Sequence, residues 1–232
     1  MVTLDLLANN LANAATSGYK SDREFYGLFS SEDSQNAIDG GTGTTLPVVE
    51  RQWTDFSPGV LQTTGNPLDV ALNGKGFFGV TGPSGPLYTR NGNFQILPTK
   101  ELGSVDGYPV RGAGGGSIQI PQGKNVNISA DGTVSVDGQT VGQIEVVDFK
   151  STDALHKVGS SNFEYTDATT PPLSAIEFTV LQGRLEGSNV LVADAAMHLV
   201  GVMRQYEMLQ KAIGISTEMD TKSIQEVARV SS

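Results

Sequence analysis

The sequence predicts an α+β fold, with N- and C-terminal α-helices forming a coiled-coil-like inner domain and a mainly antiparallel β central domain. A proline-free stretch with apolar residues at helical spacing ends the chain, and a shorter stretch of the same kind begins it. Short alternating runs and most of the 28 glycines lie between them, which indicates strands joined by tight turns. We expect a helical domain at 1–18 and 188–232, an extended connector at 19–45, and a β-rich outer domain at 46–187.

The first residues predict a short helix that ends near Gly18, which would be its C′ residue. Steps of three, four and three separate its apolar residues, Leu4, Leu7, Leu11 and Ala14. Such steps are typical of a heptad repeat. The helix also contains three poor helix formers, Asn9, Asn10 and Asn13. We expect their amides to hydrogen-bond to neighbouring helices; a marginal surface helix with polar asparagines is the alternative.

Between the helices, the turn signals predict a series of β-hairpins. Asn-Gly and Asp-Gly favour hairpin turns because both central positions need a positive φ. The four pairs are Asn73-Gly74, Asn91-Gly92, Asp131-Gly132 and Asp137-Gly138. Residues 141–149 and 176–185 complete the predicted strands, and 151–172 is predicted to be a long loop with short structure around Phe163 and Tyr165.

The last stretch, from Asn189 to about Val230, predicts a helix of about 40 residues and hence about 60 Å. Asn189 is its expected N-cap residue, and Asp194 would favour the helix dipole. Steps of four and three separate the residues of what we call the predicted stripe: Ala195, Leu199, Val202, Tyr206, Leu209 and Ile213. The first helix, with about 14 residues and about 21 Å, is too short to cover this stripe. We therefore expect assembly with other chains; a long amphipathic core helix is the alternative.

Composition argues against several classes of function. A net charge of −10 makes a basic nucleic-acid interface improbable, and the lack of cysteine excludes thiolate chemistry. No apolar run approaches about 18 residues, so direct membrane insertion is not expected. The N-terminus lacks the pattern of a cleaved signal peptide.

Enzyme activity, a cofactor and a metal are not expected either. His156 lies in a predicted polar loop, and His198 follows Asp194 by four residues, as in a helix-surface pair. The glycine-rich segment 112–117 lacks the Lys-Ser/Thr pair of a phosphate-binding loop. The acidic residues Asp131 and Asp137 belong to predicted turns.

Four motifs, in order, resemble those of the bacterial flagellar rod and hook proteins, and the resemblance covers nearly the whole chain. They are Leu4-Asp-Leu-Leu-Ala-Asn-Asn-Leu-Ala-Asn-Ala-Ala-Thr-Ser-Gly-Tyr-Lys; Pro67-Leu-Asp-Val-Ala-Leu with Gly74-Lys-Gly-Phe-Phe and Tyr88-Thr-Arg-Asn-Gly; Leu185-Glu-Gly-Ser-Asn-Val; and Arg204-Gln-Tyr-Glu-Met-Leu-Gln-Lys-Ala-Ile. The resemblance implies a self-assembling axial subunit of the basal-body rod, in the periplasm, that transmits torque from motor to hook. Its partners would be other copies, other rod proteins and the flagellar type III export apparatus, which cleaves no signal.

The family normally has one further helical stretch before the first motif, whereas Met1 stands three residues before Leu4. This difference is consistent with a start further upstream, a truncated chain or a shorter inner helix. A different class of function stays open at this point. A secreted β-domain adhesin or binding module, oligomerised by its helices, would share the same pattern of helix, β domain and helix.

Overall fold

A computed structural model describes residues 2–30, 45–121, 125–167 and 169–230. The chain divides into two compact units. The helical unit consists of residues 1–12 and 191–232, and the β body consists of residues 13–190. The predicted connector at 19–45 contributes a strand to the β body, and its residues 31–44 lie outside the described part.

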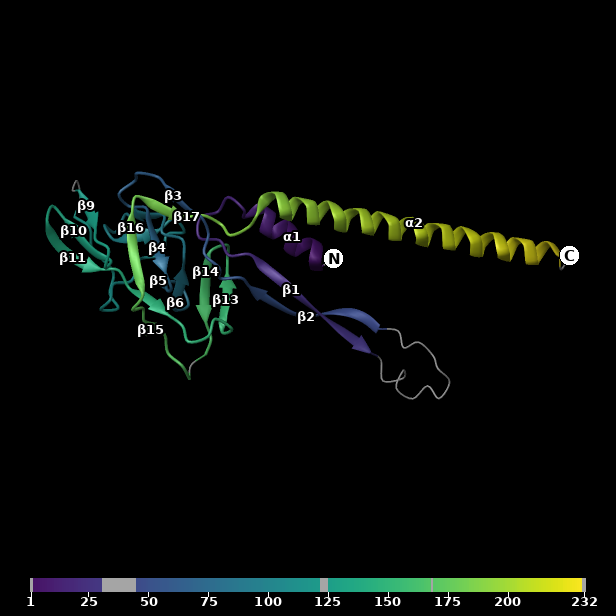
Figure 1. The fold of residues 1–232 in the computed structure, drawn as a ribbon, viewed down its shortest axis with the longest axis horizontal. Helices are drawn as coiled ribbons and strands as arrows, with labels where there is room; N and C mark the ends of the chain where they lie inside the picture. The colour runs from purple at the N-terminus through teal and green to yellow at the C-terminus, as the bar shows by residue number, and fades with distance from the viewer. Residues whose placement is uncertain (1, 31–44, 122–124, 168, 231–232) are drawn as a thin grey trace. The chain divides into compact units, whose positions relative to one another are not determined.

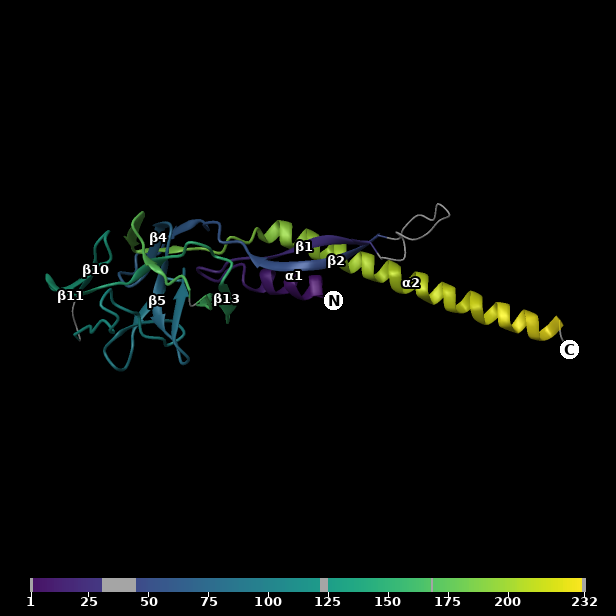
Figure 2. The same ribbon diagram turned by 90° about the horizontal axis from the view of Figure 1, so that it is seen from below.

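The helical unit contains two helices, α1 (Val2–Ala12) and α2 (Val192–Val230). They pack against each other, and both ribbon views show α1 alongside the first turns of α2 (Figures 1 and 2). At 1.5 Å per residue, the 11 residues of α1 extend about 16 Å and the 39 residues of α2 about 58 Å. Most of α2 therefore continues beyond the reach of α1.

Short antiparallel strands make up the β body. In chain order they are β1 (Asp22–Ser30), β2 (Thr45–Thr54), β3 (Leu61–Thr63), β4 (Val70–Gly74), β5 (Phe77–Thr81), β6 (Pro86–Thr89), β7 (Phe94–Ile96), β8 (Leu102–Ser104), β9 (Val126–Ile128), β10 (Thr133–Val136), β11 (Gln139–Gln143), β12 (Val146–Asp148), β13 (Leu155–Val158), β14 (Asn162–Tyr165), β15 (Leu173–Ser174), β16 (Phe178–Gln182) and β17 (Arg184–Glu186).

The largest sheet has six strands, in the order β13-β14-β6-β5-β12-β15. A three-stranded sheet has the order β11-β10-β9, and four two-stranded ribbons pair β1 with β2, β16 with β4, β17 with β3 and β7 with β8. Every one of these pairs is antiparallel, as the hairpin-rich sequence predicts.

Strand β5, inside the six-stranded sheet, is buried on both faces, and its successive side chains point to opposite sides. In β5, Phe78 enters a core that also contains Val70 and Phe94, while its neighbour Phe77 enters a second core. Edge-to-face ring contacts build the second core, including one with Phe163 at a centroid distance of 6.0 Å. The β body therefore has its own cores, formed from its own strands.

Two of the four predicted turns form hairpins. Asp137 and Gly138 have φ values of 49° and 83° and join β10 to β11, as a turn with two positive φ values requires. Gly132, with φ of 84°, lies in the connection between β9 and β10. In both places the Asp-Gly signal is confirmed.

The other two predicted hairpins are wrong. Asn73 and Gly74 end β4, which pairs with β16 rather than with the following strand β5. Asn91 and Gly92 separate β6 from β7, which belong to different sheets. Gly92 does not have a positive φ; it is packed so closely that a Cβ there would overlap the carbonyl oxygen of Val70. Close packing therefore explains this glycine better than turn chemistry does.

In the expected loop at 151–172, the short structure predicted around Phe163 and Tyr165 is strand β14, but β13 and its hairpin with β14 were not predicted. His156 belongs to β13 and is paired with Glu164, rather than lying in a loop. Among the described residues, no helix is both long enough and apolar enough to cross a lipid bilayer.

The predicted α+β fold class, with its coiled-coil-like inner domain, is wrong. The described chain is mostly β-sheet with only two helices, and no coiled-coil domain is present in this part. A coiled coil needs two helices that continue a shared repeat over several heptads. With 11 residues, α1 supplies little more than one heptad, so α2 has no helical partner of matching length within the described chain.

Candidate functional site

The predicted stripe of α2 is covered at its beginning and exposed further on. Ala195 is only 9% exposed, and Leu199 and Val202 are partly buried. Exposure then rises to 46% at Tyr206, 63% at Leu209 and 66% at Ile213. This gradient follows the end of α1, because the shorter helix contacts only part of the longer one.

On α1, the predicted interface residues Leu4, Leu7 and Leu11 are all partly buried. The three asparagines differ from one another: Asn10 is buried, Asn9 is exposed, and Asn13 is partly buried and accepts a hydrogen bond of 3.3 Å from the Thr16 hydroxyl. The structure thus gives Asn13 a local role, whereas contacts between these amides and neighbouring subunits stay a prediction.

Sequence reasoning missed a second apolar stripe on α2. At 100° per residue it lies about 140° around the helix from the predicted stripe. We call it the methionine stripe; its members, all exposed, are Met197, Met208, Ile215 and Met219. The three methionines are spaced eleven residues apart, which could have revealed the stripe in the sequence, because eleven residues complete about three helical turns.

Helix α2 contains two glycines, Gly201 and Gly214. A Cβ at either position would meet no atom within 4 Å in the isolated chain. We expect Gly214→Ala to stabilise α2 by about 1 kcal/mol, because alanine has the higher helix propensity. Circular dichroism should show α2 melting at a higher temperature than in the parent chain. Unchanged or weaker helicity would mean that helix propensity does not determine the stability of α2 at Gly214.

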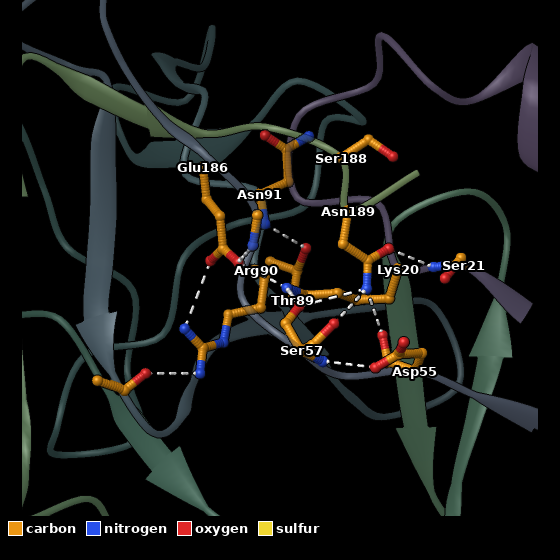
Figure 3. A network of polar contacts seen from close by, with 12 residues as sticks. Lys20, Ser21, Asp55, Ser57, Thr89, Arg90, Asn91, Glu186, Ser188 and Asn189 are labelled. Atoms are coloured by element: carbon orange, nitrogen blue, oxygen red, sulfur yellow. Dashed lines mark hydrogen bonds and ion pairs between the residues drawn. The ribbon is translucent and has the colours of Figure 1, made fainter. Parts of the chain in front are cut away.

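A buried polar junction connects the two ends of the β body. Glu186, at the end of β17, is 1% exposed, and its carboxylate faces two cations (Figure 3). The Lys20 ammonium lies 2.6 Å from Glu186 Oε1, and the Arg90 guanidinium lies 3.4 Å from Oε2. The Gly59 N–H also donates to Oε1, at 2.9 Å. One carboxylate thus joins three segments that are distant in sequence.

Each cation makes a further bond, although Arg90 Nε is buried without a hydrogen-bond partner. Lys20 Nζ donates to the carbonyl of Ser57 at 2.7 Å, and Arg90 Nη2 donates to the carbonyl of Gly74 at 2.9 Å. The Arg90 guanidinium also lies over the ring of Phe77, 5.3 Å from its centroid. Burial lowers the pKa of Lys20 and of Arg90, and the charge of Glu186 opposes both shifts. Among the charges that oppose these shifts, Glu186 contributes most for both cations.

Asn189 extends the junction and does not act as the predicted N-cap of α2. Its Oδ1 accepts the Ser21 N–H at 2.7 Å, and its Nδ2 donates to the carbonyl of Asp55 at 2.7 Å (Figure 3). The helix begins at Val192, and the carbonyl of Leu191 accepts its first hydrogen bond, from Ala195. The amide of Asn189 is thus used for tertiary contacts, three residues before the helix starts.

Gly18 is also part of the junction, rather than the C′ residue of α1. The helix ends at Ala12, and Gly18 has a φ of 69°. Its N–H donates to the carbonyl of Glu186 at 2.7 Å, and a Cβ at this position would overlap the backbone nitrogen of Asn91. Glycine is therefore required twice at this position, once for its φ and once for the close backbone approach.

A second ion pair holds the start of β1. Lys157 Nζ lies 2.6 Å from Asp22 Oδ2, donates to the carbonyl of Lys20 at 2.7 Å, and stands 4.2 Å from the ring centroid of Tyr19. Burial lowers the pKa of Lys157, while Asp22 acts to raise it. This pair attaches β13 to the segment that carries Lys20.

The residues considered as catalytic candidates in the sequence belong to ordinary structural features. His198 and Asp194 lie 3.9 Å apart, both well exposed, as a pair on the surface of α2. Segment 112–117 closes as a tight turn, in which the Gly112 N–H donates to the carbonyl of Gly116. Within the described ranges, no three His, Asp or Glu side chains gather as metal ligands would.

Three of the motifs singled out in the sequence meet at the junction. Ser17-Gly-Tyr-Lys supplies Lys20, Thr89-Arg-Asn-Gly supplies Arg90, and Leu185-Glu-Gly-Ser-Asn supplies Glu186 and Asn189. A β body closed by such a junction and continued by a helix with exposed apolar stripes fits a subunit that assembles with others.

Comparison with known proteins defines the family. Residues 71–136 match the model of the flagellar hook protein FlgE/F/G D1 domain, and residues 181–226 match the flagellar basal body rod FlgEFG protein C-terminal model. The chain is 34% identical to the basal-body rod protein FlgG of Buchnera aphidicola from Schizaphis graminum, over 94% of this chain and 91% of the relative. It is 30% identical to FlgF of Caulobacter vibrioides, over 98% and 92%, and 31% identical to FlgF of Salmonella typhimurium, over 89% and 84%.

The chain therefore belongs to the flagellar basal-body rod and hook protein family. This confirms the resemblance carried by the motifs and favours a structural rod role over that of an adhesin. The motif runs favour the FlgF type, with the FlgG type as near rival. Relatives of both types match at similar identity, so the assignment holds at the level of the family.

Proposed function

We propose that this chain is a structural axial subunit of the flagellar basal-body rod, which self-assembles through its terminal helices and helps to transmit torque from motor to hook. The observation that carries the proposal is the exposure of the predicted stripe beyond the end of α1, at Tyr206, Leu209 and Ile213. Burying one such aliphatic side chain contributes about 1.5–3 kcal/mol. Several of them on each subunit would supply a substantial driving force for assembly.

The two stripes of α2 support contacts on more than one side of the helix. Partners on both sides suit a subunit inside an array better than one of a simple pair, since an interface that does not close on itself continues into a filament. The partners we propose are other copies of this chain and other rod proteins. In the N-terminal segment, the proposed contact residues are Leu4, Leu7, Asn9, Asn10 and Leu11 of α1, and Asn13 just after it.

The location and the export route follow from the proposed role. We infer that the chain is exported by the flagellar type III apparatus without cleavage of a signal and that it joins the rod in the periplasm.

Cysteine labelling tests the proposed interface, because the chain has no cysteine of its own. We expect Ile213→Cys to react quickly with a maleimide in the isolated chain, where this position is 66% exposed. In purified basal bodies the reaction should be at least about tenfold slower, because a packed interface excludes the reagent. Equal rates in the two states would contradict assembly through this side of α2. Glu207→Cys, an exposed position between the two stripes, reports protection that is not specific to either stripe.

A further inference from the structure

We propose that Glu186, Lys20 and Arg90 form a clamp that fixes the two ends of the β body to each other, and that rod assembly depends on this clamp. The clamp would hold the segments that lead from α1 and into α2 at one defined place in every subunit. The inference rests on the proposed rod function, and it assigns to these three residues a positioning role within it.

The first argument is the set of bonds between the two ends. The Lys20 ammonium and the Gly18 N–H both bind Glu186, through its carboxylate and its carbonyl, at 2.6 and 2.7 Å. The Ser21 N–H donates to Asn189 Oδ1 at 2.7 Å, and the Asn189 N–H donates to the carbonyl of Tyr19 at 3.4 Å. These bonds join positions up to 170 residues apart in the sequence.

The second argument is where the clamp lies. None of its three residues is a member of either apolar core of the β body, and only the Arg90 guanidinium is described against one, over the ring of Phe77 in the second core. Those cores contain strands β4 to β16, with residues such as Val70, Phe78 and Val180. Opening the clamp would therefore free the two ends while leaving the cores in place, so loss of assembly can be separated from loss of folding.

The third argument is the charge balance. Two buried cations share one buried carboxylate, so removing the charge of Glu186 leaves both cations without a counter-charge. Removing Lys20 instead leaves a neutral Arg90–Glu186 pair. Losing one partner of a buried ion pair is strongly destabilising because a buried charge is left uncompensated. Glu186 should therefore be the most sensitive of the three positions.

Hydrogen exchange of the isolated chain tests the clamp itself. In Glu186→Gln we expect the amides of Gly18, Ser21 and Gly59 to exchange at least about 100-fold faster than in the parent chain. The amides of β5, in the centre of the six-stranded sheet, should be unchanged. Lys20→Met should show a smaller effect, and Lys20→Met added to Glu186→Gln should restore part of the protection, because one uncompensated cation is removed.

Glu145→Gln is the matched control. Glu145 is a partly buried carboxylate in the same β body, but it faces a single cation, Arg111, at 3.1 Å, and burial raises its pKa. None of the hydrogen bonds and ion pairs described above joins Glu145 to a clamp residue. This variant should leave the exchange of Gly18, Ser21 and Gly59 unchanged.

Incorporation into basal bodies then tests the role of the clamp. We expect Glu186→Gln to reduce incorporation at least about tenfold and Glu145→Gln to leave it unchanged. Unchanged exchange in Glu186→Gln, faster exchange throughout β5, or a larger effect of Lys20→Met would each overturn the clamp. Normal incorporation of a Glu186→Gln chain with an opened junction would overturn its role in assembly. That outcome would leave the proposed rod function standing. The rod function is tested separately, by whether the parent chain itself is incorporated.

Discussion

Leu209→Asp is expected to abolish incorporation into the rod while leaving the thermal unfolding of the β body unchanged. In the isolated chain Leu209 is 63% exposed, so a carboxylate at this position stays hydrated and costs little. In a packed interface the same carboxylate would lose its water, and the apolar contact, worth about 1.5–3 kcal/mol, would be lost as well. Quantifying the chain in purified basal bodies, together with motility and calorimetry, measures both effects.

Thr221→Asp is the control for this change, because both variants lower the net charge by one. At 100° per residue Thr221 lies between the two stripes of α2, about 80° from the predicted one. Its side chain is exposed, so a carboxylate there stays hydrated in the isolated chain and away from both proposed contact surfaces. Normal incorporation of Leu209→Asp would show that the predicted stripe is not an assembly surface. A β body that unfolds earlier in Leu209→Asp would show that this part of α2 belongs to the fold of the isolated chain.

Gly18→Ala is expected to destabilise the β body by roughly 3–5 kcal/mol. The positive φ of 69° costs a residue with a Cβ about 1–2 kcal/mol. The added methyl group would also overlap the backbone of Asn91, and overpacking of this kind costs about 1–3 kcal/mol or more. Since 1 kcal/mol corresponds to roughly 2–4 °C in a domain of this size, calorimetry should show a fall of about 10 °C.

Gly183→Ala separates the two contributions. Gly183 has nearly the same φ, 72°, but a Cβ there would have its nearest neighbour 3.7 Å away. We expect this variant to lose only the conformational part, about 1–2 kcal/mol. Equal losses in the two variants would mean that the close approach between Gly18 and Asn91 contributes nothing.

Local patterns predicted local structure well. Proline-free apolar periodicity located both helices, and Asp137-Gly138 located a hairpin because both of its φ values are positive. Asn91-Gly92 misled because the same dipeptide serves a close backbone contact with Val70 instead. The coiled-coil domain was mispredicted because apolar spacing reports which side of a helix is apolar, and not whether a partner of matching length exists in the chain.

The junction could not be predicted from the sequence, for a related reason. Lys20 and Glu186 are 166 positions apart, and no periodicity connects them. Asn189 looked like an N-cap residue by its type and its place before a helix, yet its amide bonds to Ser21 and Asp55. Only the fold brings these residues together. The exposed part of α2 was better anticipated, since its length alone showed that α1 could not cover it.

Cryo-electron microscopy of purified basal bodies that contain this chain tests the central claim most directly. The account predicts that Tyr206, Leu209 and Ile213 of each subunit are packed against helices of neighbouring subunits in the rod. The β body of each subunit should keep the fold described here. A map in which this side of α2 faces solvent, or in which the chain lies outside the rod, would contradict the account.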